Sequence, residues 1–418
     1  MEQLPELGDA PLKQDHEVDG AVDGFRAAAA PAGLRNDGRA DLALIAAEGP
    51  VAAAGVFTTN KLAAAPVLVC KEHVAGGRAQ VILANSGGAN AATGAAGLAA
   101  CRATCQAAAQ AVGCEPGQVL PCSTGVIGHE VSTFAERINQ ALPGLAAGLR
   151  PEGLSEAAGA IMTTDAFKKM ARRRTMVGGR EVTVLGMAKG AGMIRPDMAT
   201  MLCFLLTDAA ASPQALAGVL AEAVEVSFNR ISVDGDTSTN DTVLLLASGK
   251  ADNPALAPGD PELAWLGGAV TAVCQELAAM IVADGEGAGH LVRVRVSGAA
   301  TAGQARGLAY AIAHSPLVKT AFTGGDPNWG RVLAAAGAES ARAGHAFAPD
   351  KCAIYFGGVA VAREGAAVGP EAEQRAAEVM AGPRYELRLD LGLGGGEFWV
   401  LTTDLTEDYI KLNADYRS

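Results

Sequence analysis

The chain has 418 residues, of which 50% are hydrophobic and 19% are charged, as expected for an ordinary globular protein with room for two domains. Its formal net charge of −12 argues against a nucleic-acid backbone or an anionic membrane as partner. No uninterrupted apolar stretch reaches the ~18 residues of a transmembrane helix, and the acidic N-terminus lacks the pattern of a signal peptide. We therefore expect a cytoplasmic protein.

In the first half, the pattern predicts one buried strand and three helices. The apolar run 81–86 ends in Asn-Ser-Gly-Gly, which is typical of a strand that leads into a glycine-rich loop. Helices are expected over 91–112, 134–142 and 154–162. Cys101 and Cys105, two of the eight cysteines, lie four apart in the first of these helices and indicate reduced core thiols.

In the second half, the continuous apolar run 200–207 predicts a strand that is buried on both faces. Ser212 and Pro213 form an N-cap and first helical position, and a second helix follows Asp260-Pro261. Alternating residues predict half-buried strands at 292–296 and 387–391, and Gly394–Gly396 predicts a hairpin connection to 398–401. The whole pattern is mixed α/β, with helices that cover sheet faces.

Several familiar motifs fail on inspection. Lys189–Gly192 lacks the order of a Walker A loop, and Asp234–Ser238 opens like a calcium loop but lacks its later glycine and glutamate. Ser86 is not in a GxSxG elbow. The six histidines show no metal-binding spacing, so we expect no metal site.

The segment Lys189–Leu202 carries the strongest chemical signal. It reads as a glycine-rich loop, a proline and the start of a buried strand, with Thr200 at the first strand position after the small Ala199. Attack of the Thr200 hydroxyl on the Ala199 carbonyl, followed by hydrolysis of the ester, would free an α-amino group on Thr200. Such an amine, with a pKa of about 7.7–8.0, can serve as general base for its own hydroxyl. Alternatively, Thr200 simply begins a β-strand, as β-branched residues often do.

Lys189–Leu202 resembles the self-processing motif of the ornithine acetyltransferase (glutamate N-acetyltransferase) family, in which an Ala-Thr bond is cleaved. Further blocks resemble the family in the same order along the chain: Ala84–Ala91, Ser123–Gly128, Met162–Asp165, Asn229–Thr242, Asp284–Ala288, Ser315–Arg331 and Tyr409–Ser418. Departures occur at Gly88, at Gly289-His290, at Asp197 and at Ser418, none of which touches Thr124, Lys189 or Thr200.

The resemblance implies roles for individual residues. Thr200 would be the nucleophile and Ala199–Thr200 the cleaved bond. Thr124 and Gly125, on a tight Ser-Thr-Gly turn, would form the oxyanion hole. The implied substrate-binding residues are Thr163, Lys189, Thr200, Glu286, Asn413 and Ser418. Lys189 suits an α-carboxylate, Glu286 suits a cationic end or an amide N–H, and Asn413 offers both a donor and an acceptor.

The resemblance also implies the architecture. It predicts a layered helix-sheet-sheet-helix sandwich with a smaller C-terminal α/β part, self-processed into an alpha chain (1–199) and a beta chain (200–418). Residues 200–290 would complete the shared core, and 291–418 the substrate site. The expected assembly is a heterotetramer of two alpha and two beta chains.

The implied reaction is a ping-pong transfer of acetyl from N-acetylornithine to glutamate that requires no cofactor, with acetyl-CoA left open as a second donor. Two rival hypotheses remain at this point. One is an N-terminal-nucleophile amidohydrolase or aminopeptidase that uses the same Thr200 but passes the acyl group to water. The other is a catalytically silent binding protein in which the Ala199–Thr200 bond stays intact.

Overall fold

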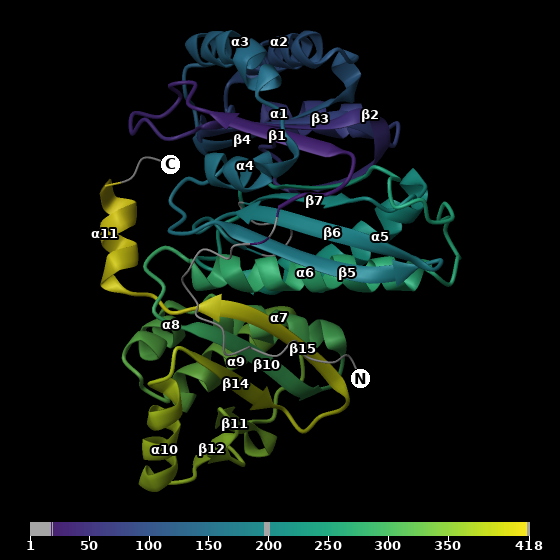
Figure 1. Cartoon of the computed structure of the whole chain (residues 1–418). Helices are drawn as coiled ribbons and strands as arrows, with labels where there is room; N and C mark the ends of the chain where they lie inside the picture. Colours follow the sequence, from purple (N-terminus) through teal and green to yellow (C-terminus); the bar gives the residue numbers. More distant parts are fainter. Residues whose placement is uncertain (1–17, 19, 196–200, 416–418) are drawn as a thin grey trace. The chain divides into compact units, whose positions relative to one another are not determined.

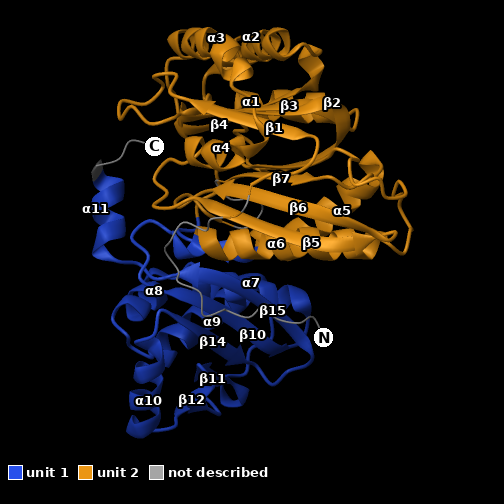
Figure 2. Ribbon diagram, viewed as in Figure 1, with its two compact units in different colours: residues 1–13, 230–235, 282–416 blue, residues 14–229, 236–281, 417–418 orange. Residues whose placement is uncertain are grey.

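The structure is a computed structural model that describes residues 18, 20–195 and 201–415. The expected cleavage site, Ala199 and Thr200, and the expected substrate residue Ser418 lie outside the described residues. The described chain divides into two compact units (Figure 2): unit 2 comprises 18, 20–195, 201–229 and 236–281, and unit 1 comprises 230–235 and 282–415.

Unit 2 is built on an eight-stranded mixed sheet of order β4-β3-β2-β9-β7-β6-β5, with β1 also paired to β2. The strands are β1 (Phe25–Ala30), β2 (Leu42–Phe57), β3 (Arg78–Gly88), β4 (Val119–Val126), β5 (Lys169–Val177), β6 (Arg180–Lys189), β7 (Leu202–Thr207) and β9 (Thr242–Ala247). Its helices are α1 (Ala65–Val74), α2 (Gly94–Val112), α3 (Ser132–Ala147), α4 (Leu154–Ala160), α5 (Pro213–Glu225) and α6 (Leu263–Ala283).

The long strand β2 joins the two halves of this sheet. Residues 42–47 of β2 pair with β1 and residues 42–46 and 51–52 pair with β3, whereas residues 52–57 pair with β9. The register shifts between Ala46 and Val51, where β2 can bend because the ladder is interrupted. One hydrogen-bonded sheet therefore supplies both groups of strands that Figure 1 shows above and below α4.

A common core lies between the two halves of the sheet. It contains Ile45 and Ile82 from one half, Leu185 and Phe204 from the other, and Leu154 from α4. Helices α2 and α3 cover the opposite face of β1–β4. The side chains buried there include Cys101 and Cys105, which were predicted to be core thiols, and Ile138, Leu142 and Leu145. All eight cysteines lie in the described part of the chain and are free.

The opposite face of the β5–β7 half packs against α6. A Cβ atom at Gly186 in β6 would lie 2.6 Å from the Val273 side chain and 2.8 Å from the Leu277 side chain, so the helix approaches the sheet closely at this glycine. By length and hydropathy alone, α6 could cross a membrane, but it is mostly buried inside the unit. This packing is that of a core helix.

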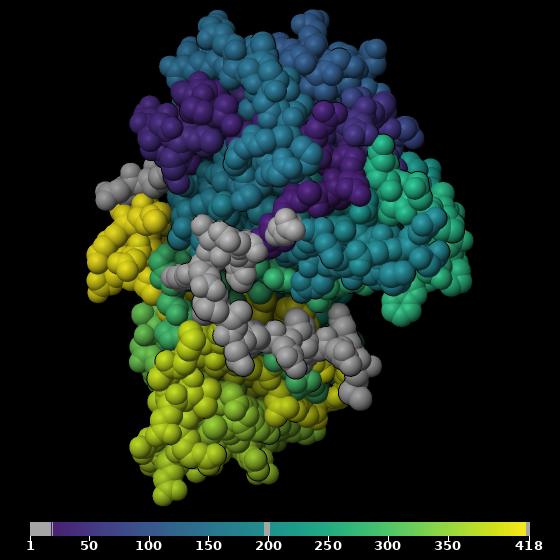
Figure 3. All heavy atoms as spheres, in the orientation of Figure 1, coloured from purple at the N-terminus to yellow at the C-terminus, as the bar shows by residue number. Residues whose placement is uncertain are grey.

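The strands that follow residue 200 lie in the middle of the sheet. β7 and β9 are neighbours in a parallel pair, and they stand between β2 and β6, which both precede residue 200. On the face shown in Figure 3, teal segments that precede residue 200 lie beside green segments that follow it. The two portions of the chain are therefore interlocked by backbone hydrogen bonds.

Unit 1 has a seven-stranded sheet of order β13-β12-β11-β14-β10-β15-β8. Its strands are β8 (Ile231–Ser232), β10 (Leu291–Ala299), β11 (Ala353–Phe356), β12 (Val359–Arg363), β13 (Ala366–Ala367), β14 (Arg384–Asp390) and β15 (Gly396–Thr403). Its helices are α7 (Ala302–Ala313), α8 (Pro316–Thr323), α9 (Trp329–Ala343), α10 (Pro370–Met380) and α11 (Glu407–Asp415).

The predicted alternation of β10 and β14 is confirmed. Valines of β10 and leucines of β14 are fully buried, while the other face carries the ion pair between Arg293 and Glu386, with 2.7 Å between Nε and Oε2. The hairpin predicted at Gly394–Gly396 is wrong, because β10 stands between β14 and β15. Gly394 and Gly396 instead permit close approach to the backbone of Ala299 and Thr301, where a Cβ atom would come within 2.5–2.9 Å.

Candidate active site

The predicted oxyanion residues lie inside strand β4, next to β3. The parallel register sets Thr124 opposite Ser86 and Gly125 opposite Gly87. The expected Ser-Thr-Gly turn is therefore wrong: the residue types favour a turn, but the ladder with β3 continues through them. Gly125 has a φ of +121°, and a Cβ atom there would lie 2.5 Å from the Gly87 carbonyl carbon. Glycine is required at this position because the neighbouring backbone occupies the space.

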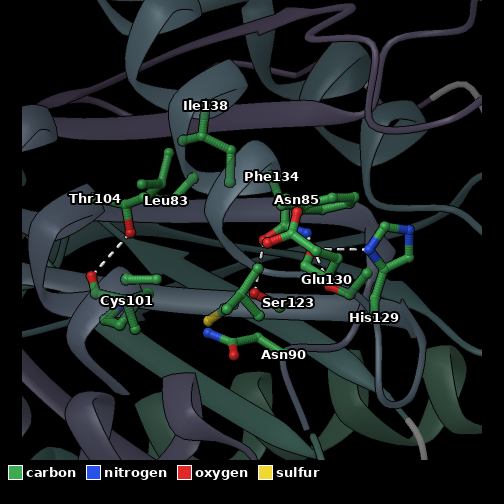
Figure 4. Close-up of a pocket in the computed structure, with 16 residues that line it drawn as sticks. Leu83, Asn85, Asn90, Cys101, Thr104, Ser123, His129, Glu130, Phe134 and Ile138 are labelled. Atoms are coloured by element: carbon green, nitrogen blue, oxygen red, sulfur yellow. Dashed lines mark hydrogen bonds between the residues drawn. The ribbon is translucent and has the colours of Figure 1, made fainter. Parts of the chain in front are cut away.

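Thr124 lies beside Lys189, the last residue of β6. The Lys189 Nζ atom donates to the Thr124 Oγ1 atom at 3.4 Å, and both residues are buried. An ammonium group can only donate, so Thr124 accepts in this contact and keeps its own O–H for another acceptor. The side chain of Ser123 instead binds Asn85 and lines a separate pocket with His129 and Phe134 (Figure 4). Alternation along the strand thus sends neighbouring hydroxyls to opposite faces.

Asp165, which the sequence analysis did not select as a site residue, organises the ends of β5 and β6. Its Oδ1 atom accepts from Lys169 Nζ at 2.6 Å and from Gly190 N at 2.7 Å. Its Oδ2 atom accepts from the backbone N of Thr163 at 2.9 Å and lies 3.9 Å from Lys189 Nζ. One buried carboxylate therefore connects the predicted substrate residues Thr163 and Lys189.

The charges around Asp165 are almost completely shielded from water. The exposed side-chain fractions are 0% for Asp165 and Lys169 and 3% for Lys189. Burial alone would raise the pKa of Asp165, but the two lysine charges and the hydrogen bonds outweigh it and hold that pKa well below its usual value. Two buried lysines thus lie around the Asp165 carboxylate.

A second polar network connects β4 to the residue that follows the expected cleavage site. Asn240 Nδ2 donates to the carbonyl oxygens of Ala89 (2.7 Å) and Ser123 (2.9 Å). The next residue, Asp241, accepts from the backbone N of Met201 at 3.0 Å. Thr242 N donates to Met201 O at 3.1 Å. Met201 is therefore fixed in position relative to the strand that holds Thr124.

The other two described substrate residues meet in unit 1. Asn413 Nδ2, on α11, donates to Glu286 Oε2 at 2.8 Å. Glu286 is 9% exposed and lies in the loop between α6 and β10. Gly287 has a φ of +67°, and a Cβ atom there would lie 2.4 Å from Tyr409 N, so glycine is needed where this loop passes α11.

The Glu286 loop is also held at its far end. Asp404 accepts from Gly289 N at 2.8 Å and pairs with His290 Nδ1 at 2.8 Å. Burial opposes ionisation of Asp404, but the hydrogen bond from His290 and the backbone contact lower its pKa. His290, one of the departures from the resembled family, thus has a structural partner in this chain.

Thr124, Gly125, Thr163 and Lys189 accordingly gather in unit 2, and Glu286 and Asn413 pair in unit 1. Sequence reasoning missed Asp165, Lys169 and Asp241. Asp165 and Asp241 lie in two of the blocks that carry the resemblance, whereas no pattern around Lys169 marks it as buried.

Comparison with known proteins gives matches along almost the entire chain. The model of the ArgJ family matches residues 26–418. The arginine biosynthesis bifunctional protein ArgJ of Geobacter sulfurreducens is 46% identical over 397 residues, which are 95% of this chain and 100% of that protein. Its counterpart in Syntrophotalea carbinolica is also 46% identical, over 95% of this chain and 99% of that protein. A crystal structure of arginine biosynthesis bifunctional protein argJ from Bacillus halodurans shows 38% identity and a TM-score of 0.47, over 51% of this chain and 98% of that one.

Proposed function

The chain belongs to the ArgJ family, and from that premise we propose that it is the self-cleaving acetyltransferase of arginine biosynthesis that moves acetyl from N2-acetyl-L-ornithine to L-glutamate. The observation that carries the proposal is the buried cluster of Thr124, Lys189 and Asp165 in unit 2, where Met201 is held by Asp241. The cluster supplies a hydroxyl donor and a cation in a site without bulk water.

Thr200 is the proposed nucleophile. Cleavage of the Ala199–Thr200 bond frees the α-amino group of Thr200, which removes the proton from the Thr200 hydroxyl. The oxygen then attacks the acetyl carbon of N-acetylornithine, and the C–N bond breaks. The leaving nitrogen takes the proton and departs as ornithine. Glutamate attacks the resulting acetyl ester through its amine, which forms N-acetylglutamate and restores the hydroxyl.

Thr124 and Gly125 are the proposed donors to the oxyanion. Because Thr124 accepts from Lys189, its own hydrogen is directed elsewhere, which suits a donor to developing negative charge. Gly125 is locked by the close approach of the Gly87–Gly88 backbone. Preorganised donors of this kind typically contribute about 2.7–4 kcal/mol each to lowering the barrier.

The buried lysines around Asp165 support recognition of an amino-acid carboxylate. Lys169 Nζ lies 2.6 Å from Asp165, whereas Lys189 Nζ lies 3.9 Å from it, so Lys189 is the lysine that Asp165 holds less closely. Thr163, Glu286, Asn413 and Ser418 are the remaining proposed substrate residues. The Glu286–Asn413 pair supplies both charged and neutral polar groups for the side-chain end of the substrate.

The sheet topology supports self-cleavage into chains that stay together. β7 and β9 are hydrogen bonded between strands that precede residue 200, so chains 1–199 and 200–418 would share one folded core. We propose that this core is the helix-sheet-sheet-helix sandwich of the family, and that residues 200–290 complete it and residues 291–418 complete the substrate site. Two such pairs of chains would assemble as a heterotetramer.

The relatives are named bifunctional, and we propose acetyl-CoA as a second acetyl donor. The test is ornithine release from N-acetylornithine with and without glutamate, followed by replacement of N-acetylornithine with acetyl-CoA. Glutamate-dependent ornithine release together with formation of N-acetylglutamate is the expected result. Ornithine release that is indifferent to glutamate would indicate an amidohydrolase instead.

A further inference from the structure

The peptide group between Met162 and Thr163 is held from both sides by charged side chains. Its carbonyl oxygen, on Met162, accepts from Arg35 Nη1 at 2.7 Å. Its N–H group, on Thr163, donates to Asp165 Oδ2 at 2.9 Å. A trans peptide group is planar, and its C=O and N–H point in opposite directions. Because hydrogen bonds to ionised groups are roughly twice as strong as neutral ones, the two contacts together fix the plane that leads into Thr163.

Arg35 reaches this peptide from the loop between β1 and β2, residues 31–40, which we call the arginine loop. The backbone of the arginine loop is organised by Asp41, which is 1% exposed and immediately precedes β2. The Asp41 side chain accepts from Ala32 N and Leu34 N, both at 2.6 Å, and from Arg35 N at 3.0 Å. Three backbone N–H groups on one carboxylate give Arg35 a fixed starting point.

The guanidinium group of Arg35 is oriented by a second carboxylate in the same loop. Arg35 Nε and Nη2 donate to Asp37 Oδ2 at 3.1 and 2.7 Å, which directs Nη1 to the Met162 carbonyl. Arg39 Nε also donates to Asp37 Oδ2, at 2.9 Å. The hydrogen bonds from Arg35 and Arg39 hold the pKa of Asp37 well below its usual value, so Asp37 is an anion at neutral pH. The Arg35 side chain is 17% exposed, against 53% for Arg39.

The arginine loop lies against the strand pair that holds the proposed oxyanion donors. A Cβ atom at Gly87 in β3 would lie 2.8 Å from Leu34 O and 3.2 Å from Arg35 Cγ. Gly87 is the register partner of Gly125 in β4. The arginine loop therefore contacts both this strand pair and the peptide group that leads into Thr163.

We propose that Arg35 is a positioning residue for substrate recognition, which fixes the Met162–Thr163 peptide and so directs the Thr163 side chain to the substrate. This inference rests on the proposed function, in which Thr163 is a substrate residue. Arg35 itself touches no substrate and exchanges no proton in the reaction. It holds one side of the peptide group, and Asp165 holds the other.

Removal of the guanidinium should affect substrate binding more than chemistry or folding. The Ser86 hydroxyl still donates to Ala160 O at 2.8 Å, and Asp165 still binds Thr163 N, so the segment keeps two of its anchors. Arg35→Met keeps an apolar stem but has no donor for the peptide. A misdirected Thr163 weakens ground-state and transition-state binding alike, which raises KM and leaves kcat nearly unchanged. KM for N-acetylornithine should rise about 2- to 12-fold, as for the loss of one ordinary hydrogen bond.

Arg39→Met is the matched control. Arg39 belongs to the same arginine loop and binds the same Asp37 carboxylate, but its guanidinium group donates there and not to the Met162 carbonyl. Arg39→Met therefore removes an equal charge from the same loop. It should leave both KM and kcat unchanged.

The experiment is a double-mutant cycle on ornithine release from N-acetylornithine, with Arg35→Met, Thr163→Val, the double variant and Arg39→Met. Urea unfolding checks that each variant is folded. Thr163→Val removes the hydroxyl and keeps the shape of the side chain. An effect of Arg35→Met that acts through Thr163 should therefore shrink to less than about 2-fold in the Thr163→Val background, which is the ordinary scatter of additivity.

A rise in KM that occurs in Arg35→Met, is absent from Arg39→Met and disappears in the Thr163→Val background supports the inference. An unchanged KM, a rise shared by Arg39→Met, or a rise of the same size in the Thr163→Val background overturns it. If Arg35→Met does not fold, Asp37→Ala removes the carboxylate that orients the guanidinium group and decides by the same readouts.

Failure of the inference and failure of the proposed function give different results. Ornithine is counted whether glutamate or water takes the acetyl group, so a hydrolase outcome defeats the proposed function and leaves this test intact. Unmodified protein that releases no ornithine, and binds none in calorimetry, refutes the proposed function and the inference with it. Normal release by the unmodified protein with an unchanged KM in Arg35→Met overturns the inference alone.

Discussion

Substitution of Gly125 by alanine should damage catalysis far more than it damages stability. The new Cβ atom would lie 2.5 Å from Gly87 C and 2.7 Å from Gly88 N, where ordinary contacts begin at 3.4 Å. Relief requires a relative shift of about 1 Å between two hydrogen-bonded strands. The φ of +121° adds backbone strain of about 1–3 kcal/mol.

The catalytic loss follows from the same displacement. A misplacement of about 1 Å near the reacting atoms can reduce the rate by about 10²-fold, and loss of one oxyanion donor reduces it by about 10²–10³-fold. We therefore expect Gly125→Ala to lower kcat for acetyl transfer by about two to three orders of magnitude, with KM for N-acetylornithine changed much less. Self-cleavage should slow as well, because it passes through a similar tetrahedral oxyanion.

Gly128→Ala is the matched control for this prediction. Gly128 also has a positive φ, +74°, but a Cβ atom there meets nothing within 4 Å. This variant should lose only about 1–2 kcal/mol of stability through backbone strain and should be cleaved and active. Steady-state acetyl transfer, the extent of cleavage and urea unfolding distinguish the two variants. If Gly125→Ala turns over like Gly128→Ala, the assignment of the oxyanion strand is refuted.

Three further outcomes follow from the contacts described above. Asp165→Asn removes the carboxylate that pairs with the buried Lys169 and lies near Lys189, and it should lower the free energy of unfolding by about 3–5 kcal/mol. Glu72→Gln removes only an exposed ion pair with Arg102 and should leave urea unfolding almost unchanged; equal losses would contradict the role of Asp165. Asn413→Asp places a second carboxylate beside Glu286 and should raise KM for glutamate more than KM for N-acetylornithine. Asn413→Ser is the neutral control. Equal increases in the two KM values would argue against the proposal that this pair faces the side-chain end of the substrate. Burial of Lys319 lowers its pKa to about 8, despite the nearby carboxylates Asp404 and Asp234, so the folded state binds fewer protons than the unfolded state between about pH 8 and 10.5. Over that window the contribution of Lys319 to the free energy of unfolding should rise with pH, by at most ~1.4 kcal/mol per pH unit. Lys319→Met should therefore reduce the slope of the unfolding free energy against pH. An unchanged slope would contradict the prediction.

The sequence predicted individual elements well where burial alone decides them. The apolar run after residue 200 became β7, and Ser212 caps α5 by accepting from Ala215 N at 3.2 Å, as its position before Pro213 indicated. Cys101 and Cys105 lie on the buried side of α2. Such patterns report that a segment has an apolar face, and that information is local to the segment.

Partnership between distant segments could not be predicted in this way. The hairpin expected at Gly394–Gly396 failed because the neighbour of both flanking strands is β10, about a hundred residues earlier in the chain. Ser-Thr-Gly at 123–125 was expected to turn, yet its pairing with β3 keeps it extended. The place of β9 in the middle of the sheet likewise depends on non-local pairing, antiparallel with β2 and parallel with β7.

Buried charge was the least visible feature of the site. Lys168 and Lys169 are chemically identical neighbours, but Lys168 is half-buried and Lys169 is fully buried against Asp165. Only the antiparallel register, which sets Lys169 opposite Ala188, brings it beside Lys189. A single sequence does not distinguish such a lysine from an ordinary surface residue.

The most direct test of the account is the intact mass of the purified protein after incubation with N-acetylornithine in the absence of glutamate. The account predicts two chains, the second beginning at Thr200, and a gain of one acetyl group on the N-terminal peptide of that second chain, which disappears when glutamate is added. Thr200→Ala should remain a single unacetylated chain. Normal acetyl transfer by a protein whose 199–200 bond is intact would contradict the central claim.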